Sequence, residues 1–124
     1  MTSETRARRI GKRIAEVLSE LLQQAVDDPR LKMVTVSSVD VDRELSYATI
    51  YVTAFDAPER IDEILRALVR ARGFLRRELA ARIPLRSFPQ LRFRYDASLD
   101  HGSRIDSLLK EIRREEERAG GESS

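Results

Sequence analysis

The side chains best suited to chemistry in this sequence are arginines, and they gather in two runs. Of its 23 basic residues, only Lys12, Lys32 and Lys110 are lysines. Between residues 66 and 94 the only acid is Glu78, and the nine arginines there are Arg66, Arg70, Arg72, Arg76, Arg77, Arg82, Arg86, Arg92 and Arg94. A second run near the N-terminus comprises Arg6, Arg8, Arg9, Lys12 and Arg13. Because a guanidinium grips phosphate with two parallel hydrogen bonds and stacks on bases, this pattern indicates a surface that binds a polyanion.

The composition also has a plainer interpretation, in which an arginine-rich genome simply supplies solvated helix faces. The formal net charge is only +2, because acids collect in other parts of the chain. The position of the first run argues against that interpretation. Basic side chains in the first turns of a helix oppose the helix dipole and gain nothing from local helix physics. Their presence there favours an external partner.

Other kinds of site fit the sequence poorly. The chain has no cysteine, which excludes a thiolate nucleophile, a Cys-ligated zinc site and a disulfide framework. Its one histidine, His101, lies between Asp100 and Gly102 and is expected to be a surface-loop residue, not a general base. The acids around Asp42 include no glycine that would fold a cation-binding loop. We therefore expect no catalytic residue, no metal and no cofactor, and hence no enzymatic activity.

Length and hydropathy predict a protein of the cytoplasm. No segment reaches the ~18 consecutive apolar residues that a transmembrane helix needs, and Met1–Arg13 lacks the apolar stretch of a secretory signal. A chain of 124 residues is long enough for one compact domain without staples. We expect that domain to be a monomer with no membrane partner.

The elements that position the first arginine run follow from hydrophobic periodicity. Apolar residues from Ile10 to Ala25 recur at helical spacing and predict an amphipathic helix that ends near Asp27-Asp28-Pro29. A β-branched strand from Val34 to Val41 follows, with a bulge at Ser37-Ser38. Strict alternation from Tyr47 to Ala54 predicts its antiparallel partner, with one face packed.

The second arginine run falls on a helical pattern that Pro58 opens and Pro84 ends. Gly73 interrupts this pattern, and a glycine inside a helix costs about 1 kcal/mol relative to alanine. The sequence therefore predicts either a kinked helix or two helices joined at Gly73. Alternation from Leu91 to Asp96 predicts a third strand.

The C-terminal part of the sequence has two expected features. Ser103 to Asp106 has the form of a capping box, and it precedes a short helix that reaches Ile112. We expect this helix to complete a domain of residues 1–112. Residues 113–124 are charged and then rich in Gly and Ser, so we expect them to form a disordered tail.

The segment around Gly73 has the features of an RNA-binding joint. KH domains press a glycine-containing turn between two helices against the nucleic-acid backbone, where free N–H groups and the positive end of a helix meet phosphate. The usual G-x-x-G is missing, and the shorter Ala71-Arg72-Gly73 stands at the joint. Arg70, Arg76 and Arg77 flank it.

A competing interpretation makes the same segment a core helix whose arginines pair with acids at helical spacing. Asp62 is placed to hold Arg66, and Glu78 is placed to hold Arg82. The arginines around Gly73 are not all provided with acids in this way, which favours phosphate binding.

The chain also resembles a known family, bacterial ribosome-binding factor A, from Arg8 to about Ile112. The order and spacing of six segments carry the resemblance, namely Arg9–Ile14, Asp28–Leu31, Val34–Val39, Ala48–Val52, Gly73–Leu79 and Leu85–Phe93. The resemblance implies an α+β, type II KH-like domain with a three-stranded sheet, helices on one face and a helix-kink-helix in which Ala-x-Gly replaces G-x-x-G.

The same resemblance implies a ribosome assembly factor that binds 16S rRNA in the immature 30S subunit. It implies late maturation, 5′-end processing of 16S rRNA and a part in cold adaptation. Asp28-Pro29-Arg30 match a family motif to which we assign no contact. Their expected role is to end the first helix, with Arg30 paired or solvated.

The predicted RNA-binding residues are Arg6, Arg8, Arg9, Lys12, Arg13, Arg70, Ala71, Arg72, Gly73, Arg76 and Arg77. Arg92 and Arg94 either extend this surface or are merely solvated. The alternative function is a protein-interaction adaptor, which would use a strand edge or the sheet face of Tyr47, Thr49, Tyr51 and Thr53. Gly11 is given no role.

Overall fold

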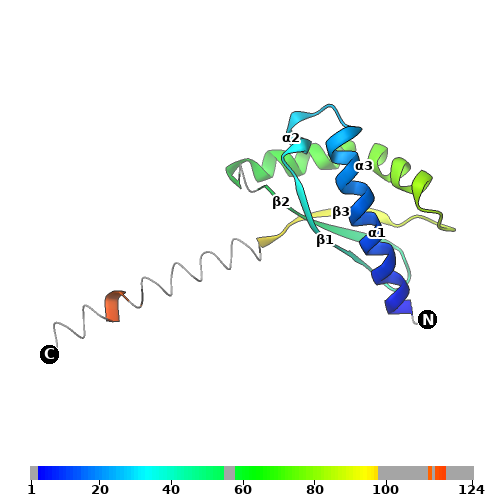
Figure 1. The fold of residues 1–124 in the computed structure, drawn as a ribbon, viewed down its shortest axis with the longest axis horizontal. Helices are drawn as coiled ribbons and strands as arrows, with labels where there is room; N and C mark the ends of the chain where they lie inside the picture. Colours follow the sequence, from blue (N-terminus) through cyan, green and yellow to red (C-terminus); the bar gives the residue numbers. More distant parts are fainter. Residues whose placement is uncertain (1–2, 55–57, 98–111, 113, 117–124) are drawn as a thin grey trace.

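The computed structural model describes residues 3–54, 58–97, 112 and 114–116, and Figure 1 shows how they are arranged. The elements in chain order are α1 (Ser3–Gln24), α2 (Pro29–Lys32), β1 (Thr35–Val41), β2 (Tyr47–Thr53), the single 3₁₀ turn η1 (Pro58–Arg60), α3 (Ile61–Arg82) and β3 (Gln90–Tyr95). His101, the capping box, most of the predicted C-terminal helix and most of the predicted tail lie outside the described residues. The predicted domain boundary at residue 112 remains a prediction.

The three strands form one mixed sheet in the order β1-β2-β3. β1 and β2 are antiparallel, and β2 and β3 are parallel, so α3 serves as the crossover between them. The register shifts between Val36 and Ser38, which confirms the predicted bulge. The extra residue, Ser37, uses its hydroxyl to tie the bulge to the end of β3, since Oγ donates to Asp96 Oδ2 at 2.6 Å.

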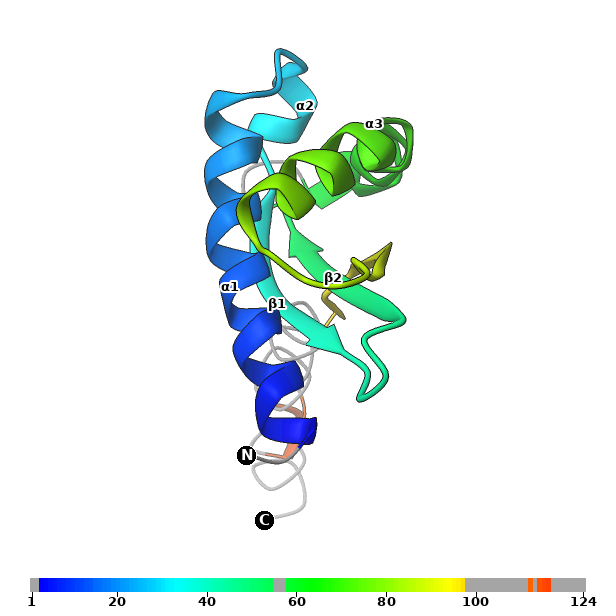
Figure 2. The same cartoon turned by 90° about the vertical axis from the view of Figure 1, so that its right-hand side faces the viewer.

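Both long helices lie on one face of the sheet, α1 against β1 and α3 against β3 (Figures 1 and 2). The side chains of Ile14 and Leu18 on α1 and of Ile50 on β2 are completely buried between these layers. Full burial of such a side chain contributes roughly 1.5–3 kcal/mol, so the amphipathic stripe fixes how α1 sits on the sheet. The predicted α+β architecture, with helices on one face, is confirmed.

Gly11 allows α1 to approach β1 closely. A Cβ atom at this position would lie 2.8 Å from the Val39 carbonyl oxygen and 3.4 Å from Cγ2 of Val41. The nearest atom belongs to the backbone and cannot rotate away as a flexible side chain would. Leaving Gly11 without a role was therefore wrong, because it sets the distance between a helix and a strand.

The helix α3 runs unbroken through Gly73. Its α-helical residues extend from Ile61 to Arg82, and no glycine among the described residues has positive φ. The sequence left open either one kinked helix or two helices joined at Gly73. The second alternative is wrong, because α3 is a single helix. Any bend at Gly73 therefore occurs inside one continuous helix, without a turn between two elements.

The outer face of β2 is smaller than the alternation predicted. Tyr47 is exposed and Thr49 and Tyr51 are half-buried, but Thr53 is only 4% exposed. Its Oγ1 is buried without a hydrogen-bond partner among the described residues. The expectation that Thr53 lies on an open face is wrong, because the strand ends there against the core.

None of the described helices is long and apolar enough to span a membrane.

Candidate nucleic-acid interface

The five basic residues of the first run lie on the solvent side of α1. The opposite side of the same turns carries Ala7, Ile10 and Ile14, which are buried against the sheet. All five basic side chains are exposed, and they are Arg6, Arg8, Arg9, Lys12 and Arg13. Only Arg13 has an acidic partner within the described chain, at 3.4 Å from Glu16. The other four make no ion pair with an acid of the described residues.

The exposed face of α3 brings Arg70, Gly73 and Arg77 into one line. These residues are spaced by three and four positions, which places them on successive turns of one helix face. The Arg77 side chain folds back along that line, so that its Nη1 lies 3.4 Å from where a Cβ on Gly73 would stand. Arg72 is exposed beside the line, whereas Ala71 is half-buried and packs against the core.

Gly73 is not explained by the packing of the fold. Its φ is not positive, and a Cβ there would meet only the end of the flexible Arg77 side chain. A glycine nevertheless costs about 1 kcal/mol at such an exposed helix position. The helix backbone at Gly73 is therefore left bare between two arginines at a position where the described fold does not require a glycine.

Arg76 is held by the fold and differs in this from its neighbours. Its side chain is half-buried, Nε donates to the Pro89 carbonyl oxygen at 3.0 Å, and Nη2 donates to the Phe88 carbonyl oxygen at 2.6 Å. Arg76 therefore anchors the connection between α3 and β3. Unlike its freely exposed neighbours it is tied to two backbone carbonyls, although three of its five N–H groups make no hydrogen bond within the described residues.

The acids expected to pair with the outer arginines of α3 do so at one end only. Arg82 donates to the Glu78 carboxylate, as predicted. No such pair joins Asp62 to Arg66 among the described residues, and the ion pair at the helix start is the one between Glu63 and Arg60, at 3.2 Å. The arginines around Gly73 thus keep their charge unneutralised by neighbours on α3.

The motif Asp28-Pro29-Arg30 forms a capped turn beside α3. Asp28 is the N-cap of α2, and its Oδ1 accepts from the Arg30 backbone N–H at 3.0 Å. The Arg30 guanidinium also grips the same carboxylate, with Nη2 at 2.7 Å from Oδ2. These bonds from Arg30 lower the pKa of the Asp28 carboxyl from 3.8 to about 2, and the charge of Arg70 acts in the same direction. The motif is therefore structural, and Arg30 is paired.

We expect the Asp28 carboxyl to titrate with a midpoint near pH 2 in the folded protein. Because the folded-state pKa lies below the unfolded value, this contribution to stability is complete above pH 3.8 and disappears as the pH falls toward 2. Carboxyl ¹³C NMR measures the midpoint directly. In the control Arg30→Gln the midpoint should return toward 3.8. An ordinary midpoint in the unsubstituted protein would contradict the predicted pairing.

The fold brings members of both arginine runs to one hollow. Arg6 from α1 and Arg76 from α3 line the same hollow, together with Arg86 from the connection between α3 and β3. Arg92 lies elsewhere, on the face of the sheet that no described helix covers, where its guanidinium stacks on the Tyr47 ring at 3.5 Å from the centroid. No group of three or more potential metal ligands gathers in the described parts of the chain.

Comparison with known proteins assigns the chain to a family. A family model described as "Ribosome-binding factor A" matches residues 6–109. The chain belongs to the ribosome-binding factor A family. The relative from Chromohalobacter salexigens is 49% identical over 108 residues, which cover 86% of this chain and 82% of that protein. The relative from Desulfitobacterium hafniense is 38% identical over 118 residues, covering 95% of this chain and 94% of that protein.

Solved structures of ribosome-binding factor A show the same fold. The crystal structure from Thermus thermophilus aligns with a TM-score of 0.63 at 35% identity, covering 72% of this chain and 94% of that one. The solution structure of a Thermotoga maritima protein gives 0.62 at 38% identity, covering 69% of this chain and 82% of that one. These matches confirm the type II KH-like fold. The family match also places the chain among ribosome-binding factors.

Sequence reasoning did not select Arg86 as a candidate residue. It follows Pro84 by two residues, in a segment assigned to a loop, so no helical spacing linked it to either run. Its neighbours are set by the Arg76 bonds to Phe88 and Pro89, which turn the connection back toward α1. The available signal was the acid-free segment from Arg82 to Arg94.

Proposed function

We propose that this protein binds 16S rRNA within the immature 30S subunit and assists late maturation, including processing of the 16S 5′ end. It would act in the cytoplasm as a monomer, with a part in adaptation to cold. A homology model of the Thermus thermophilus ribosome-binding factor A, fitted into a cryo-EM map of a 30S complex, supports the partner. That model is 36% identical, with a TM-score of 0.58 over 70% of this chain and 91% of that one. Primer extension on 16S rRNA from cells lacking the protein tests the processing step.

The exposed backbone at Gly73 is the observation that carries this proposal. Arg70, Arg72 and Arg77 surround it, and none of them makes a hydrogen bond or ion pair within the described residues. A phosphate can approach a helix closely only where no side chain stands in the way. Gly73 provides that approach at a cost in helix stability, and the arginines provide the charge.

Recognition by such a surface depends on shape and charge. Double-helical RNA hides its base edges in a deep, narrow groove, so proteins mostly meet its phosphates and 2′-hydroxyls. The α3 face and the basic side of α1 offer guanidinium groups in a fixed arrangement on two rigid helices. Such an arrangement is suited to recognising the shape of a folded rRNA surface and not to reading a particular base sequence.

We expect the affinity for immature 30S subunits to fall steeply with salt. If about five phosphates are neutralised, the logarithm of the association constant should decrease against log salt with a slope of roughly −3.5 to −4.5. A titration of labelled protein with purified immature subunits at several KCl concentrations measures this slope. A slope near zero would rule out binding through phosphate.

The alternative function, a protein-interaction adaptor, is less well supported. Part of its proposed face is removed, since Thr53 is buried and the Tyr47 ring is covered on one side by Arg92. The adaptor hypothesis predicts a protein partner whose affinity is unchanged when Arg72→Glu and Arg77→Glu are combined. The RNA-binding hypothesis predicts that this pair of changes nearly abolishes binding to immature subunits.

A further inference from the structure

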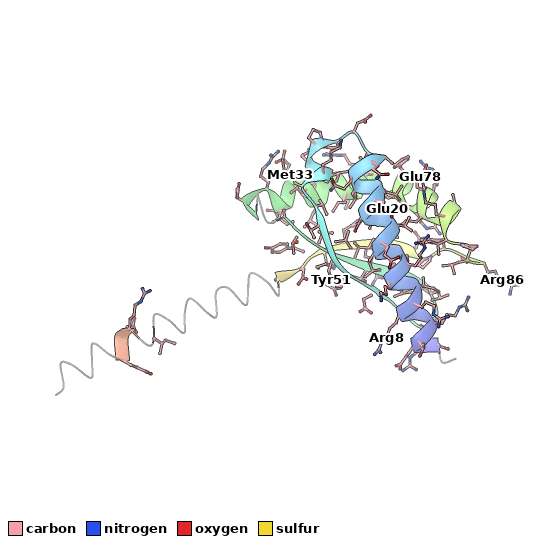
Figure 3. All side chains as sticks on the ribbon, viewed as in Figure 1. Arg8, Glu20, Met33, Tyr51, Glu78 and Arg86 are labelled. Atoms are coloured by element: carbon pink, nitrogen blue, oxygen red, sulfur yellow. The ribbon has the colours of Figure 1, made fainter. Side chains whose placement is uncertain are left out.

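An open hollow of about 370 Å³ lies where the start of α1, the β1–β2 turn and the α3–β3 connection meet. Three arginines line it, Arg6 from α1, Arg76 from α3 and Arg86 from the α3–β3 connection, with the serines Ser46 and Ser87 beside them. The only acid in its lining is Glu44. Figure 3 shows Arg86 at the outer tip of the connection, and Arg8 pointing away from it on the other side of α1.

The walls of this hollow are held in place by the fold. Arg76 fixes the connection through the Phe88 and Pro89 carbonyl oxygens, as described above. The Gln90 N–H donates to the Ser46 carbonyl oxygen at 2.8 Å, which ties the start of β3 to the β1–β2 turn. A site that is already organised loses little freedom when it binds its ligand.

The β1–β2 turn beside the hollow contains strained backbone. Leu45 lines the hollow and has a φ of 58°, the only positive φ among the described non-glycine residues. Asp42 holds this conformation, because its Oδ1 accepts from the N–H groups of Ser46 at 2.7 Å and Tyr47 at 3.0 Å. Strained residues that their surroundings hold in place are found most often at binding sites and switch regions.

A second hollow on the other side of α1 has the opposite charge balance. Its volume is about 630 Å³, and its acids are Glu4, Asp40, Asp42 and Glu44. Only Arg8 and Arg43 oppose them, and Arg43 is already paired with Glu4 at 2.7 Å. An anion near the start of α1 is therefore drawn to the smaller hollow and repelled by the larger one.

We propose that the hollow lined by Arg6, Arg76 and Arg86 binds one phosphate group of the RNA. This inference rests on the proposed function and adds a contact that is separate from the Gly73 face. Arg76 offers its three remaining N–H groups from a fixed position, and Arg6 and Arg86 close on the phosphate from two sides. The hydroxyls of Ser46 and Ser87 are further donors. The phosphate is either an internal phosphodiester or a terminal phosphate.

Matched substitutions on α1 test the subsite in RNA binding. Arg6→Gln and Arg8→Gln remove the same charge from exposed positions of one helix, on opposite flanks. We expect Arg6→Gln to weaken binding to immature 30S subunits about tenfold, as the loss of a charged hydrogen bond does, and Arg8→Gln to weaken it clearly less. The salt slope should become shallower by about one unit for Arg6→Gln. Equal losses would overturn the subsite and leave the proposed function standing.

Glu44→Gln provides a test with the opposite sign. The carboxylate of Glu44 is exposed, makes no hydrogen bond within the described chain and would lie near the bound phosphate. Removing its charge should raise the affinity, by roughly threefold at low salt, because a like charge at the rim is lost. Unchanged or weaker binding by this variant would contradict the proposed subsite.

NMR titration of the full chain with pyrophosphate reads the subsite without any ribosomal particle. Amide shifts should concentrate at Ser46, Ser87 and Gln90, and they should be much smaller at Val39 and Asp40 beside the acidic hollow. Shifts here without 30S binding would refute the proposed function and keep the subsite, whereas their absence would refute the subsite alone.

A comparison of two oligoribonucleotides identifies the kind of phosphate. If a 5′-phosphorylated oligoribonucleotide binds more tightly than the same sequence with a 5′-hydroxyl, the subsite takes a terminal phosphate, and equal affinities identify a phosphodiester.

Discussion

Gly11→Ala is expected to destabilise the protein by roughly 1–2 kcal/mol. Its Cβ would stand 2.8 Å from the Val39 carbonyl oxygen, so α1 must move away from β1 to make room. Overpacking of this kind costs about 1–3 kcal/mol, and the better helix propensity of alanine returns at most about 1 kcal/mol. The loss should also spread to Ile14 and Leu18, whose buried side chains depend on the same helix position.

Urea unfolding followed by circular dichroism measures the effect. Gly73→Ala is the matched control, because it makes the same chemical change in a helix at an exposed position, where a Cβ meets only the tip of Arg77. The two variants should change the free energy of unfolding in opposite directions. If both are stabilised, the close approach of α1 to β1 is wrong.

The requirement for glycine at position 11 could be suspected from the sequence but not deduced. The helix pattern places Gly11 on the buried stripe, one turn after Ala7, and two small residues one turn apart are typical of close approach. What they approach is decided by Val39, on a strand whose position over α1 depends on the whole fold. Local periodicity describes a helix face, whereas the atom opposite that face is a tertiary property.

The elements themselves were predictable because their signals are local. Alternation of Ala48, Ile50 and Val52 marked the buried face of β2, and the phase change at Ser37-Ser38 marked the bulge. The short helix α2 was missed because its signal, a capping aspartate before a proline, also marks the end of the preceding helix. The parallel pairing of β3 with β2 was left open, since a strand pattern carries no direction.

The arginines show where counting charges along a sequence is insufficient. Helical spacing relates each arginine only to acids on the same helix face, but Arg76 donates to the Phe88 and Pro89 carbonyl oxygens. Such acceptors exist at every residue, so composition gives no warning of them. Arg70 likewise interacts with the carboxylate of Asp28, which is distant in sequence, and helps to lower its pKa. The sequence could therefore predict which elements carry the exposed arginines, but it could not rank the individual residues as candidates for the site.

Gly73→Val is expected to weaken binding to immature 30S subunits by about tenfold or more, equivalent to roughly 1.4 kcal/mol. The branched side chain would fill the gap between Arg70 and Arg77 and displace the Arg77 guanidinium that now lies over it. It would also hold a phosphate away from the helix backbone by about the thickness of a methyl group. The protein itself should remain folded, because the position is exposed and valine in a helix is no worse than glycine.

Ala80→Val separates this effect from a general disturbance of α3. Ala80 is exposed and lies seven residues after Gly73, so it presents the same new side chain on the same helix face two turns away. Its binding curve should stay within about twofold of the unsubstituted protein, a change near 0.4 kcal/mol. Gly73→Ala adds a sharper condition, since it should raise the free energy of unfolding by about 0.5–1 kcal/mol while lowering the affinity. If Gly73 served only the fold, a variant that folds more stably would bind immature 30S subunits as well as the unsubstituted protein does. Higher stability together with lower affinity therefore indicates that the glycine serves binding.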